Sequence, residues 1–285
     1  MVRIDGNTEE LRRAVRKARE GGAEVGLVPT MGYLHEGHLS LVRRSRAENK
    51  ATVVSIFVNP TQFGPNEDFG AYPRDLERDA ILLEREGVDI VFCPSPEDLY
   101  LPDHSTFVNE DRVSRDLCGA SRPGHFRGVC TIVLKLFNLV GPDRAYFGEK
   151  DYQQLQVIRR MARDLNVGVE IKGCPIVREK DGLALSSRNV YLSKEDRVAA
   201  LTLNRALGRA RALFGRGERK AALLVGEVRL ELEKEERVCL EYAELRDAVD
   251  LSVVETAEKP AVLALAARVG KTRLIDNTVL GEVTS

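Results

Sequence analysis

The sequence is poor in several features that mark particular classes of protein. Its five cysteines are scattered (Cys93, Cys118, Cys130, Cys174 and Cys239) and form no Cys-x-x-Cys pair. That scatter argues against a zinc site or a redox pair and favours a reducing, cytoplasmic environment. The 43 basic and 44 acidic residues leave a net charge of −1. There is therefore no electrostatic reason to expect nucleic acid or a membrane surface as a partner.

Long hydrophobic runs are missing as well. The most apolar stretch, residues 129–140, contains Lys135 and Asn138 and is shorter than the ~20 residues that a membrane span needs. The N-terminal segment differs from a signal peptide, because Asn7 followed by Glu10 is typical of a helix cap. We therefore expect no transmembrane segment, and we expect the N-terminal segment to belong to the fold.

From residue 1 to about 180, apolar strand-like runs alternate with amphipathic helices. The expected strands are Val25–Pro29, Thr52–Val58, Ile90–Cys93, Arg144–Phe147 and Val169–Cys174. The expected helices are 38–48, 74–86, about 128–140 and 151–165. This alternation predicts an α/β fold with a parallel sheet and helices on both faces. Ligands of such sheets bind beyond the carboxyl ends of the strands.

The pattern changes after Gly182. Ser193 and Asp196 predict the start of a helix that runs to about residue 214, and a second helix is expected near 218–235. Three candidate strands follow, at 237–243, 261–267 and 272–276. Two helices followed by strands favour a smaller α+β domain over residues 181–285, next to a larger domain over 1–180.

Histidine is scarce, with four in the chain, yet two of them stand together in His35-Glu36-Gly37-His38. The order of strand, turn and helix is expected to place both imidazoles at a helix N-terminus, with His38 as its first residue. Unpaired N–H groups and the helix dipole favour a phosphate there. The spacing of three is wrong for a zinc-protease helix. A purely structural role for either histidine is the alternative.

Two further segments fit a polyphosphate. Phe147-Gly148-Glu149-Lys150-Asp151 ends a strand, and Lys150 supplies positive charge where phosphates would lie. Asp151 either caps its own helix or bonds a ribose hydroxyl. The loop of residues 177–189 offers glycine, paired hydroxyls and Arg188, which suit a phosphate clamp. A solvated interdomain loop is the alternative for this segment.

A fourth segment has a different chemistry. Residues 57–64 place two neutral amides, Asn59 and Gln62, among aromatic residues and proline. Amides in an apolar wall suit the hydroxyl and carboxylate groups of a small organic acid. Residues 122–128 offer similar chemistry, with ordinary turn structure as an equal alternative. The inferred site joins a nucleotide to a small acid, whose carboxylate would attack the α-phosphate of ATP.

Six blocks of sequence together resemble the pantoate–β-alanine ligase (pantothenate synthetase) family. They are Thr30–His38, Phe57–Phe63, Tyr72–Arg74, Arg122–Phe126, Gly148–Gln154 and Asp181–Asn189. They follow the family's order, and their joint occurrence is highly specific. The His-x-Gly-His element alone is shared by a nucleotidyltransferase superfamily that includes class I aminoacyl-tRNA synthetases. The resemblance implies a cytoplasmic homodimer with a Rossmann-like N-terminal domain and a C-terminal domain that closes over the active site.

The resemblance also implies a reaction and its residues. ATP and pantoate would give pantoyl adenylate and pyrophosphate, and β-alanine would then displace AMP to form pantothenate. The implied ATP contacts are Met31, Gly32, Tyr33, Leu34, His35, Glu36, Gly37, His38, Gly148, Glu149, Lys150, Asp151, Val177, Leu185, Ser186, Ser187 and Arg188. His38 would be the proton donor, and Gln62 and Gln154 would hold pantoate, with Gln62 also near β-alanine. Mg²⁺ is implied with ATP, without identifiable ligands.

Two other classes of function remain open from the sequence. A nucleotidyltransferase that leaves the nucleotide on its product would explain His35 to His38 and the clamp, but not the amides at Asn59 and Gln62. A non-catalytic nucleotide-binding module would bind ATP without exchanging pyrophosphate.

Overall fold

The computed structural model describes residues 1–65 and 67–282. The chain divides into two compact units. Unit 1 comprises Met1–Glu149 and Val157–Pro175, and unit 2 comprises Lys150–Gln156 and Ile176–Ser285. In the described part of the chain, none of the helices combines the length and apolar character that crossing a bilayer requires.

Unit 1 is built on a six-stranded sheet in the order β1-β4-β3-β2-β5-β6, in which every pair of neighbours is parallel. The strands are β1 (Val2–Ile4), β2 (Val25–Thr30), β3 (Ala51–Ile56), β4 (Ile90–Phe92), β5 (Arg144–Gly148) and β6 (Glu170–Cys174). The predicted parallel sheet is confirmed. β1 was not predicted, because three residues with a central arginine form no apolar run.

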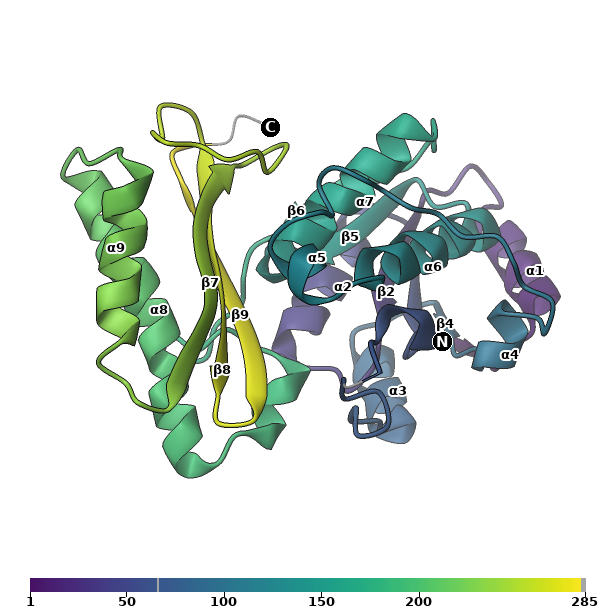
Figure 1. Ribbon diagram of the computed structural model, residues 1–285. Helices are drawn as coiled ribbons and strands as arrows, with labels where there is room; N and C mark the ends of the chain where they lie inside the picture. Colours follow the sequence, from purple (N-terminus) through teal and green to yellow (C-terminus); the bar gives the residue numbers. More distant parts are fainter. Residues whose placement is uncertain (66, 283–285) are drawn as a thin grey trace. The chain divides into compact units, whose positions relative to one another are not determined.

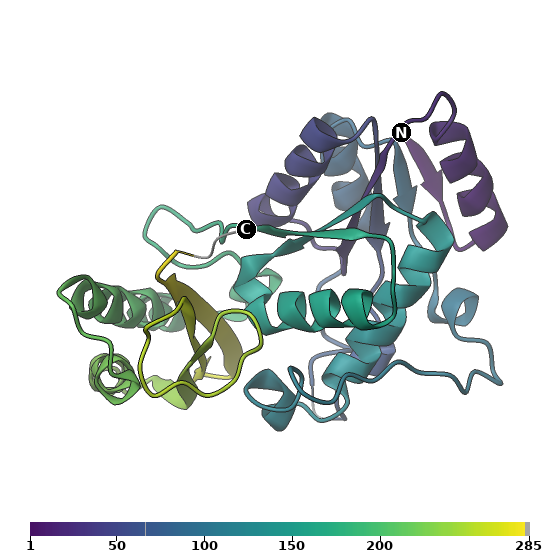
Figure 2. The same ribbon diagram turned by 90° about the horizontal axis from the view of Figure 1, so that it is seen from above.

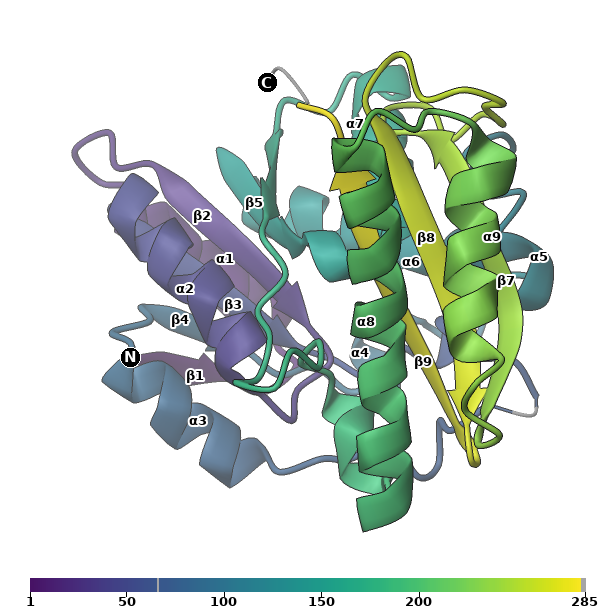
Figure 3. The same ribbon diagram turned by 90° about the vertical axis from the view of Figure 1, so that its left-hand side faces the viewer.

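Helices cover both faces of this sheet. The long ones are α1 (Thr8–Ala18), α2 (Glu36–Glu48), α3 (Leu76–Arg85), α6 (His125–Val140) and α7 (Tyr152–Asp164), and the short ones are α4 (Pro96–Leu99), α5 (Cys118–Ser121), η1 (Pro60–Gln62) and η2 (Glu149–Asp151). Figure 3 shows α2 and α3 in front of the strands and α1 behind them, where it packs against α6. The chain crosses the sheet in one direction from β1 to β2 and in the opposite direction from β2 to β3. Because both crossovers are right-handed, their connecting helices lie on opposite faces of the sheet.

The core of unit 1 explains why its strands are recognisable in the sequence. Val28, Val54 and Val91 lie on three neighbouring strands and are fully buried beneath Val42 and Leu83, which belong to the covering helices. A parallel sheet with both faces covered needs near-continuous apolar strands. The Asn7 cap is confirmed too, since its Oδ1 accepts the Glu10 N–H at 3.0 Å.

Unit 2 contains a three-stranded antiparallel sheet in the order β7-β8-β9, with two helices on one face (Figures 1 and 2). Its elements are η3 (Ser187–Tyr191), α8 (Lys194–Gly215), α9 (Ala221–Leu232), β7 (Val238–Asp247), β8 (Ala261–Val269) and β9 (Thr272–Leu280). Leu207, Leu224 and Leu263 meet in its core. The predicted α+β organisation is confirmed, and β7 and β9 both run about four residues further than expected.

Candidate active site

The turn after β2 is tightly folded at the carboxyl edge of the parallel sheet. Gly32 has a φ of +81°, and Tyr33 has a φ of +50°, which an L-residue rarely adopts. A Cβ on Gly32 would stand 3.0 Å from Ile56 Cγ2 and 3.1 Å from Asp79 Oδ2. The turn therefore fits closely between β3 and α3, and only glycine is accommodated at residue 32.

Asp79 of α3 holds this strained turn in place. Its two carboxylate oxygens accept the N–H groups of Tyr33 at 2.6 Å and Leu34 at 2.8 Å. The guanidinium of Arg78 donates to the Leu34 carbonyl at 2.9 Å. Burial raises the pKa of Asp79, while the two backbone N–H groups oppose that rise. Because both of its oxygens accept backbone N–H groups, the Asp79 carboxylate keeps the turn in its strained conformation.

Asp79 was not predicted as a site residue. A signal was present, because Asp79 lies three residues after Leu76 and four before Leu83, on the face that α3 buries. A carboxylate on a buried helix face needs a partner, and here the partner is the backbone of the turn.

The two histidines cap α2 reciprocally. The helix begins at Glu36 with His35 as its N-cap, so the prediction that His38 is the first helical residue was wrong. His35 Nδ1 accepts the Gly37 N–H at 3.2 Å, and His38 Nδ1 accepts the His35 N–H at 3.3 Å. The Gly37 amide, expected to be unpaired, thus has a partner within the chain. The imidazole rings lie 4.1 Å apart.

These bonds define the tautomer of both histidines. A ring nitrogen that accepts a backbone N–H carries no proton, so a neutral ring holds its proton on Nε2. Both His35 and His38 therefore have Nε2–H as the donor. A group that donates a hydrogen bond toward a phosphate oxygen needs this arrangement.

Gln62 lies against the histidine turn, the segment of residues 31–38 that leads from β2 into α2. Gln62 is the last residue of η1 and is buried, and its Nε2 donates to the sulfur of Met31 at 2.9 Å. Asn59 Nδ2 donates to Gln62 Oε1 at 3.2 Å, so both ends of the Gln62 amide are oriented. Gln62, which the sequence predicts to bind a small acid, therefore lies beside the turn that the sequence predicts to bind a phosphate.

Asn59 is held by several hydrogen bonds within the protein. It is 1% exposed, and its Nδ2 also donates to the Gly128 carbonyl at 3.1 Å. Its Oδ1 accepts the hydroxyls of Tyr100 and Thr61, both at 2.9 Å. These contacts direct the Asn59 amide toward Gln62 and its surroundings, and a substrate contact of Asn59 stays a prediction.

The segment of residues 122–128 supports the backbone of Gln62. Arg122 pairs with Glu67 at 2.6 Å and donates to His125 Nε2 at 3.0 Å. An arginine only donates, so His125 Nε2 is the acceptor and its Nδ1–H bonds the Gln62 carbonyl at 2.9 Å. Burial raises the pKa of Glu67, but the bonds and charge of Arg122 outweigh it and leave that pKa lowered. In this structure the segment therefore supports the Gln62 turn.

Gly128 allows α6 to approach the Gln62 turn. A Cβ at this position would stand 2.4 Å from the Thr61 carbonyl oxygen and 2.6 Å from the Gln62 nitrogen. Real Cβ contacts are never so short, and the obstructing atoms are backbone. The Gln62 turn is therefore fixed by close packing as well as by hydrogen bonds.

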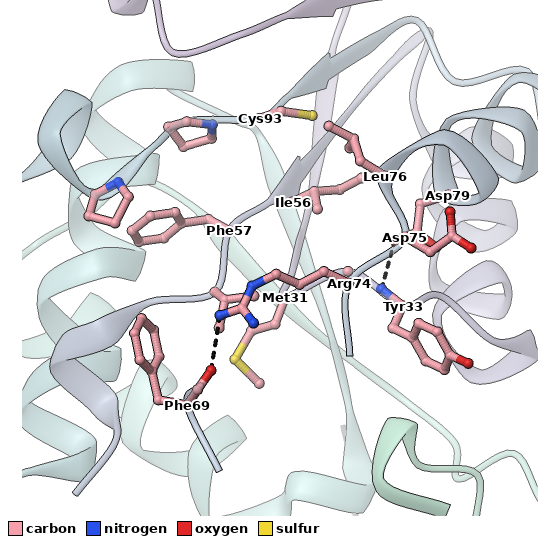
Figure 4. A pocket seen from close by; sticks show the side chains of 14 residues that line it. Met31, Tyr33, Ile56, Phe57, Phe69, Arg74, Asp75, Leu76, Asp79 and Cys93 are labelled. Atoms are coloured by element: carbon pink, nitrogen blue, oxygen red, sulfur yellow. Dashed lines mark hydrogen bonds between the residues drawn. The ribbon is translucent and has the colours of Figure 1, made fainter. Parts of the chain in front are cut away.

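A cavity of about 280 Å³ opens beside residues 31–33 of the turn after β2 (Figure 4). Its lining is mostly apolar and comprises Met31, Gly32, Tyr33, Ile56, Phe57, Val58, Phe69, Arg74, Asp75, Leu76, Asp79, Cys93, Pro94 and Pro96. Arg74 donates to the carbonyls of Tyr72 and Phe69 at 2.9 and 3.0 Å. The guanidinium thus closes one wall of the cavity.

The remaining predicted residues belong to unit 2, apart from Gly148 and Glu149, which end unit 1. Lys150 and Asp151 close η2, and Gln154 lies on the first turn of α7. Residues 177–188 form a hydrogen-bonded hairpin, in which the Leu185 N–H donates to the Val177 carbonyl at 3.0 Å. Ser186 then caps η3, which contains Ser187 and Arg188.

Neither an activated thiol nor a protein-built metal site accompanies these residues. Burial raises the pKa of Cys93 and Cys174 to about 11 and that of Cys130 to about 12. Such thiols are protonated at neutral pH and poorly nucleophilic. Across residues 1–65 and 67–282, no group of three or more histidine, cysteine, aspartate or glutamate side chains is placed to hold a metal ion.

Comparison with known proteins defines the class of enzyme. The family model described as pantoate-beta-alanine ligase matches residues 3–279. The pantothenate synthetase of Thermotoga neapolitana is 59% identical over 280 residues, which cover 98% of this chain and 100% of the relative. That of Pseudothermotoga lettingae is 58% identical over 277 residues, covering 97% and 98%.

Solved structures agree. Pantothenate synthetase from Thermus thermophilus superposes with a TM-score of 0.93 at 48% identity, covering 98% of this chain and 99% of that one. The ligase of Francisella tularensis, solved with β-γ ATP and β-alanine, has a TM-score of 0.80 at 34% identity, covering 98% and 97%. The chain belongs to the pantoate–β-alanine ligase family. It is therefore an enzyme of pantothenate biosynthesis, as the sequence blocks predicted.

Proposed function

We propose that the protein ligates (R)-pantoate to β-alanine at the expense of ATP, through a pantoyl-adenylate intermediate. In the first step a pantoate carboxylate oxygen bonds the α-phosphorus, and the bond from phosphorus to pyrophosphate breaks. In the second step the β-alanine nitrogen bonds the acyl carbon, the bond to AMP breaks, and the amine loses a proton. The observation that carries the proposal is the 2.9 Å contact between Gln62 Nε2 and Met31 Sδ.

Gln62 is the residue we assign to pantoate. A neutral amide both donates and accepts hydrogen bonds. It can therefore bind a hydroxyl and a neighbouring carboxylate without adding a charge of its own. Its orientation by Asn59 and its backbone support by His125 support this role, because a preorganised contact loses little entropy on binding. We assign Gln154 as a second pantoate contact, and we place the β-alanine amine near Gln62.

The histidine turn and the unit 2 segments are assigned to ATP. His38 is proposed as the proton donor toward the phosphates, because a neutral ring whose Nδ1 accepts the His35 N–H offers its Nε2–H as a hydrogen-bond donor. Lys150 and Arg188 would neutralise charge on the phosphates, and the turn would supply close backbone contacts. The other assigned ATP contacts are Met31, Gly32, Tyr33, Leu34, His35, Glu36, Gly37, Gly148, Glu149, Asp151, Val177, Leu185, Ser186 and Ser187.

Magnesium is proposed to enter with ATP. Mg²⁺ is usually held by substrate phosphates and waters together with one or two carboxylates. The lack of a metal-binding cluster among the described residues fits an ion carried mainly by the triphosphate. Its chemistry there would be to neutralise phosphate charge.

The wider organisation is also proposed. We assign residues 1–180 as the ATP- and pantoate-binding domain and 181–285 as the domain that closes over the active site. A homodimer in the cytoplasm is the assembly and place that the family resemblance implies. The neutral overall charge supports small molecules, and neither nucleic acid nor membrane, as partners.

Isotope exchange between pyrophosphate and ATP tests the function. We expect exchange that requires pantoate, followed by release of AMP and an amide when β-alanine is added. Mass spectrometry separates this outcome from a nucleotidyltransferase, which would leave a stable nucleotide on its product. Binding of ATP without exchange in the presence of pantoate would contradict the proposal.

A further inference from the structure

The edge strand β9 carries two adjacent polar residues, Asp276 and Asn277, which are only 3% and 4% exposed. They pair in register with Leu265 and Ala264 of the neighbouring β8. Successive side chains of a strand point to opposite faces, so two adjacent residues can reach two different segments. Buried polar groups need partners, and the partners of these two residues belong to segments assigned to ATP.

Asp276 reaches the base of the hairpin of residues 177–188. Its carboxylate receives Arg178 in a bidentate pair, with N–O distances of 2.7 and 2.8 Å. Arg178 Nη1 also donates to the Gly182 carbonyl at 3.1 Å, inside the hairpin. Arg178 follows Val177 directly and pairs with Ala184, the residue before Leu185. The ion pair therefore fixes both ends of the segment that leads to Arg188.

Asn277 reaches the other segment. Its Nδ2 donates to the carbonyl oxygen of Lys150 at 2.9 Å. Lys150 begins the short stretch that unit 2 includes, and this stretch has a second tie, from the Tyr152 hydroxyl to the Ala248 carbonyl at 2.8 Å. The backbone of Lys150 is thus held by the sheet of unit 2.

The two contacts are linked to each other. Asp276 Oδ1 accepts the backbone N–H of Asn277 at 2.8 Å while it also receives Arg178. A displacement of Asp276 therefore affects the Lys150 turn as well as the hairpin.

We propose that Asp276 and Asn277 are positioning residues that hold the Lys150 turn and the residue 177–188 hairpin as one ATP-binding body. This inference rests on the proposed assignment of both segments to ATP. Lys150 and Arg188 can neutralise the same triphosphate only if their backbones keep a fixed spacing, and β9 supplies that spacing. Neither Asp276 nor Asn277 touches a reacting atom.

The test compares three variants in two assays. Asp276→Asn weakens the bidentate pair, Asn277→Ser shortens the side chain that reaches Lys150, and Glu241→Gln is the control. Glu241 of β7 forms a bidentate pair with Arg273 of β9, at 2.8 and 2.9 Å. Neither residue belongs to the Lys150 turn or to the hairpin. The assays are pyrophosphate exchange at varied ATP and β-alanine capture from supplied pantoyl adenylate.

We expect Asp276→Asn and Asn277→Ser to raise the ATP concentration for half-maximal exchange by about tenfold, because each variant weakens a hydrogen-bonded contact that holds one of the assigned ATP segments. The β-alanine requirement and the Glu241→Gln variant should stay near the wild type. An unchanged ATP requirement in folded variants would overturn the proposal, and so would equal losses in both assays. If Asp276→Asn fails to fold, Asn277→Ser decides the question. Absence of exchange in the wild type would instead contradict the proposed function.

Discussion

The Gln62 turn of unit 1, proposed for pantoate, and the segments of unit 2 proposed for ATP are held in different ways. Gln62 is fixed by the Asn59 amide, by His125, which Arg122 and Glu67 hold in turn, and by a glycine that lets a helix approach its backbone. The unit 2 segments are fixed by a buried ion pair and an amide from an edge strand. An ion pair contributes to both regions, whereas at Gln62 close backbone packing adds a constraint that does not depend on charge. If the two supports are independent, a substitution in one region should change the requirement for one substrate and leave the other requirement unchanged.

The largest effect is expected from His38→Ala, which removes the proposed proton donor of the first step. Loss of one oriented hydrogen-bond donor to charge that develops in the transition state costs roughly 10²–10³-fold, so adenylate formation should fall by about that factor. Capture of preformed adenylate by β-alanine should fall far less. Single-turnover measurement of both half-reactions checks this, and equal losses would contradict the role of His38.

Gly128→Ala should come next, because its Cβ would collide with the Thr61 carbonyl and the Gln62 nitrogen. A displacement of about 1 Å at a positioned group can cost roughly 10²-fold. The pantoate requirement should rise by up to that factor while ATP binding stays nearly intact. Gly226→Ala, where an added Cβ meets nothing within 4 Å, is the matched control. A small effect at Gly128 would show that packing does not fix the turn.

Asp79→Asn should have an intermediate effect. The amide keeps one acceptor oxygen, so one of the Tyr33 and Leu34 N–H groups loses its partner, at a cost of about 1–3 kcal/mol. Because the strained turn carries His35 and His38, we expect a lower rate of adenylate formation together with a lower melting temperature. Normal activity in this variant would mean that the turn keeps its shape unaided.

The smallest effect concerns pH. The pKa of Glu67 is lowered, since the pairing with Arg122 outweighs the raising effect of burial. Its stabilisation of the Gln62 turn is therefore complete above the ordinary value of 4.5 and is lost as pH falls through the lowered pKa. Glu67→Gln should make the pantoate requirement less sensitive to acid in that range. Identical pH profiles for the two proteins would contradict the coupling.

The features that the sequence predicted correctly depend on residues that lie close together in the chain. The apolar strands β2 to β5 were recognisable because both faces of a parallel sheet are buried, and the Asn7 and Ser193 caps follow from side chains three residues from their partners. The pairing of His35 and His38 was visible for the same reason. Their register in α2 was not, because the capping box places His38 as the third residue of the helix.

The supports of the site were beyond prediction because their partners lie far away in the chain. Asp276 meets Arg178 across 98 residues, and Asn277 meets Lys150 across 127. Arg122 and His125 read as ordinary turn residues until the Gln62 carbonyl is placed beside them. The burial of Asn59 and its bond to the Gly128 carbonyl likewise depend on a segment far away in the chain.

Gln62 is proposed to receive the acid beside the histidine turn that is proposed to bind ATP. The most direct test is pyrophosphate exchange with Gln62→Ala, measured over a range of pantoate and then over a range of ATP. The account predicts a large increase in the pantoate requirement, with an ATP requirement close to that of the wild type. Equal increases in both would contradict it, and would mean that Gln62 only supports the fold.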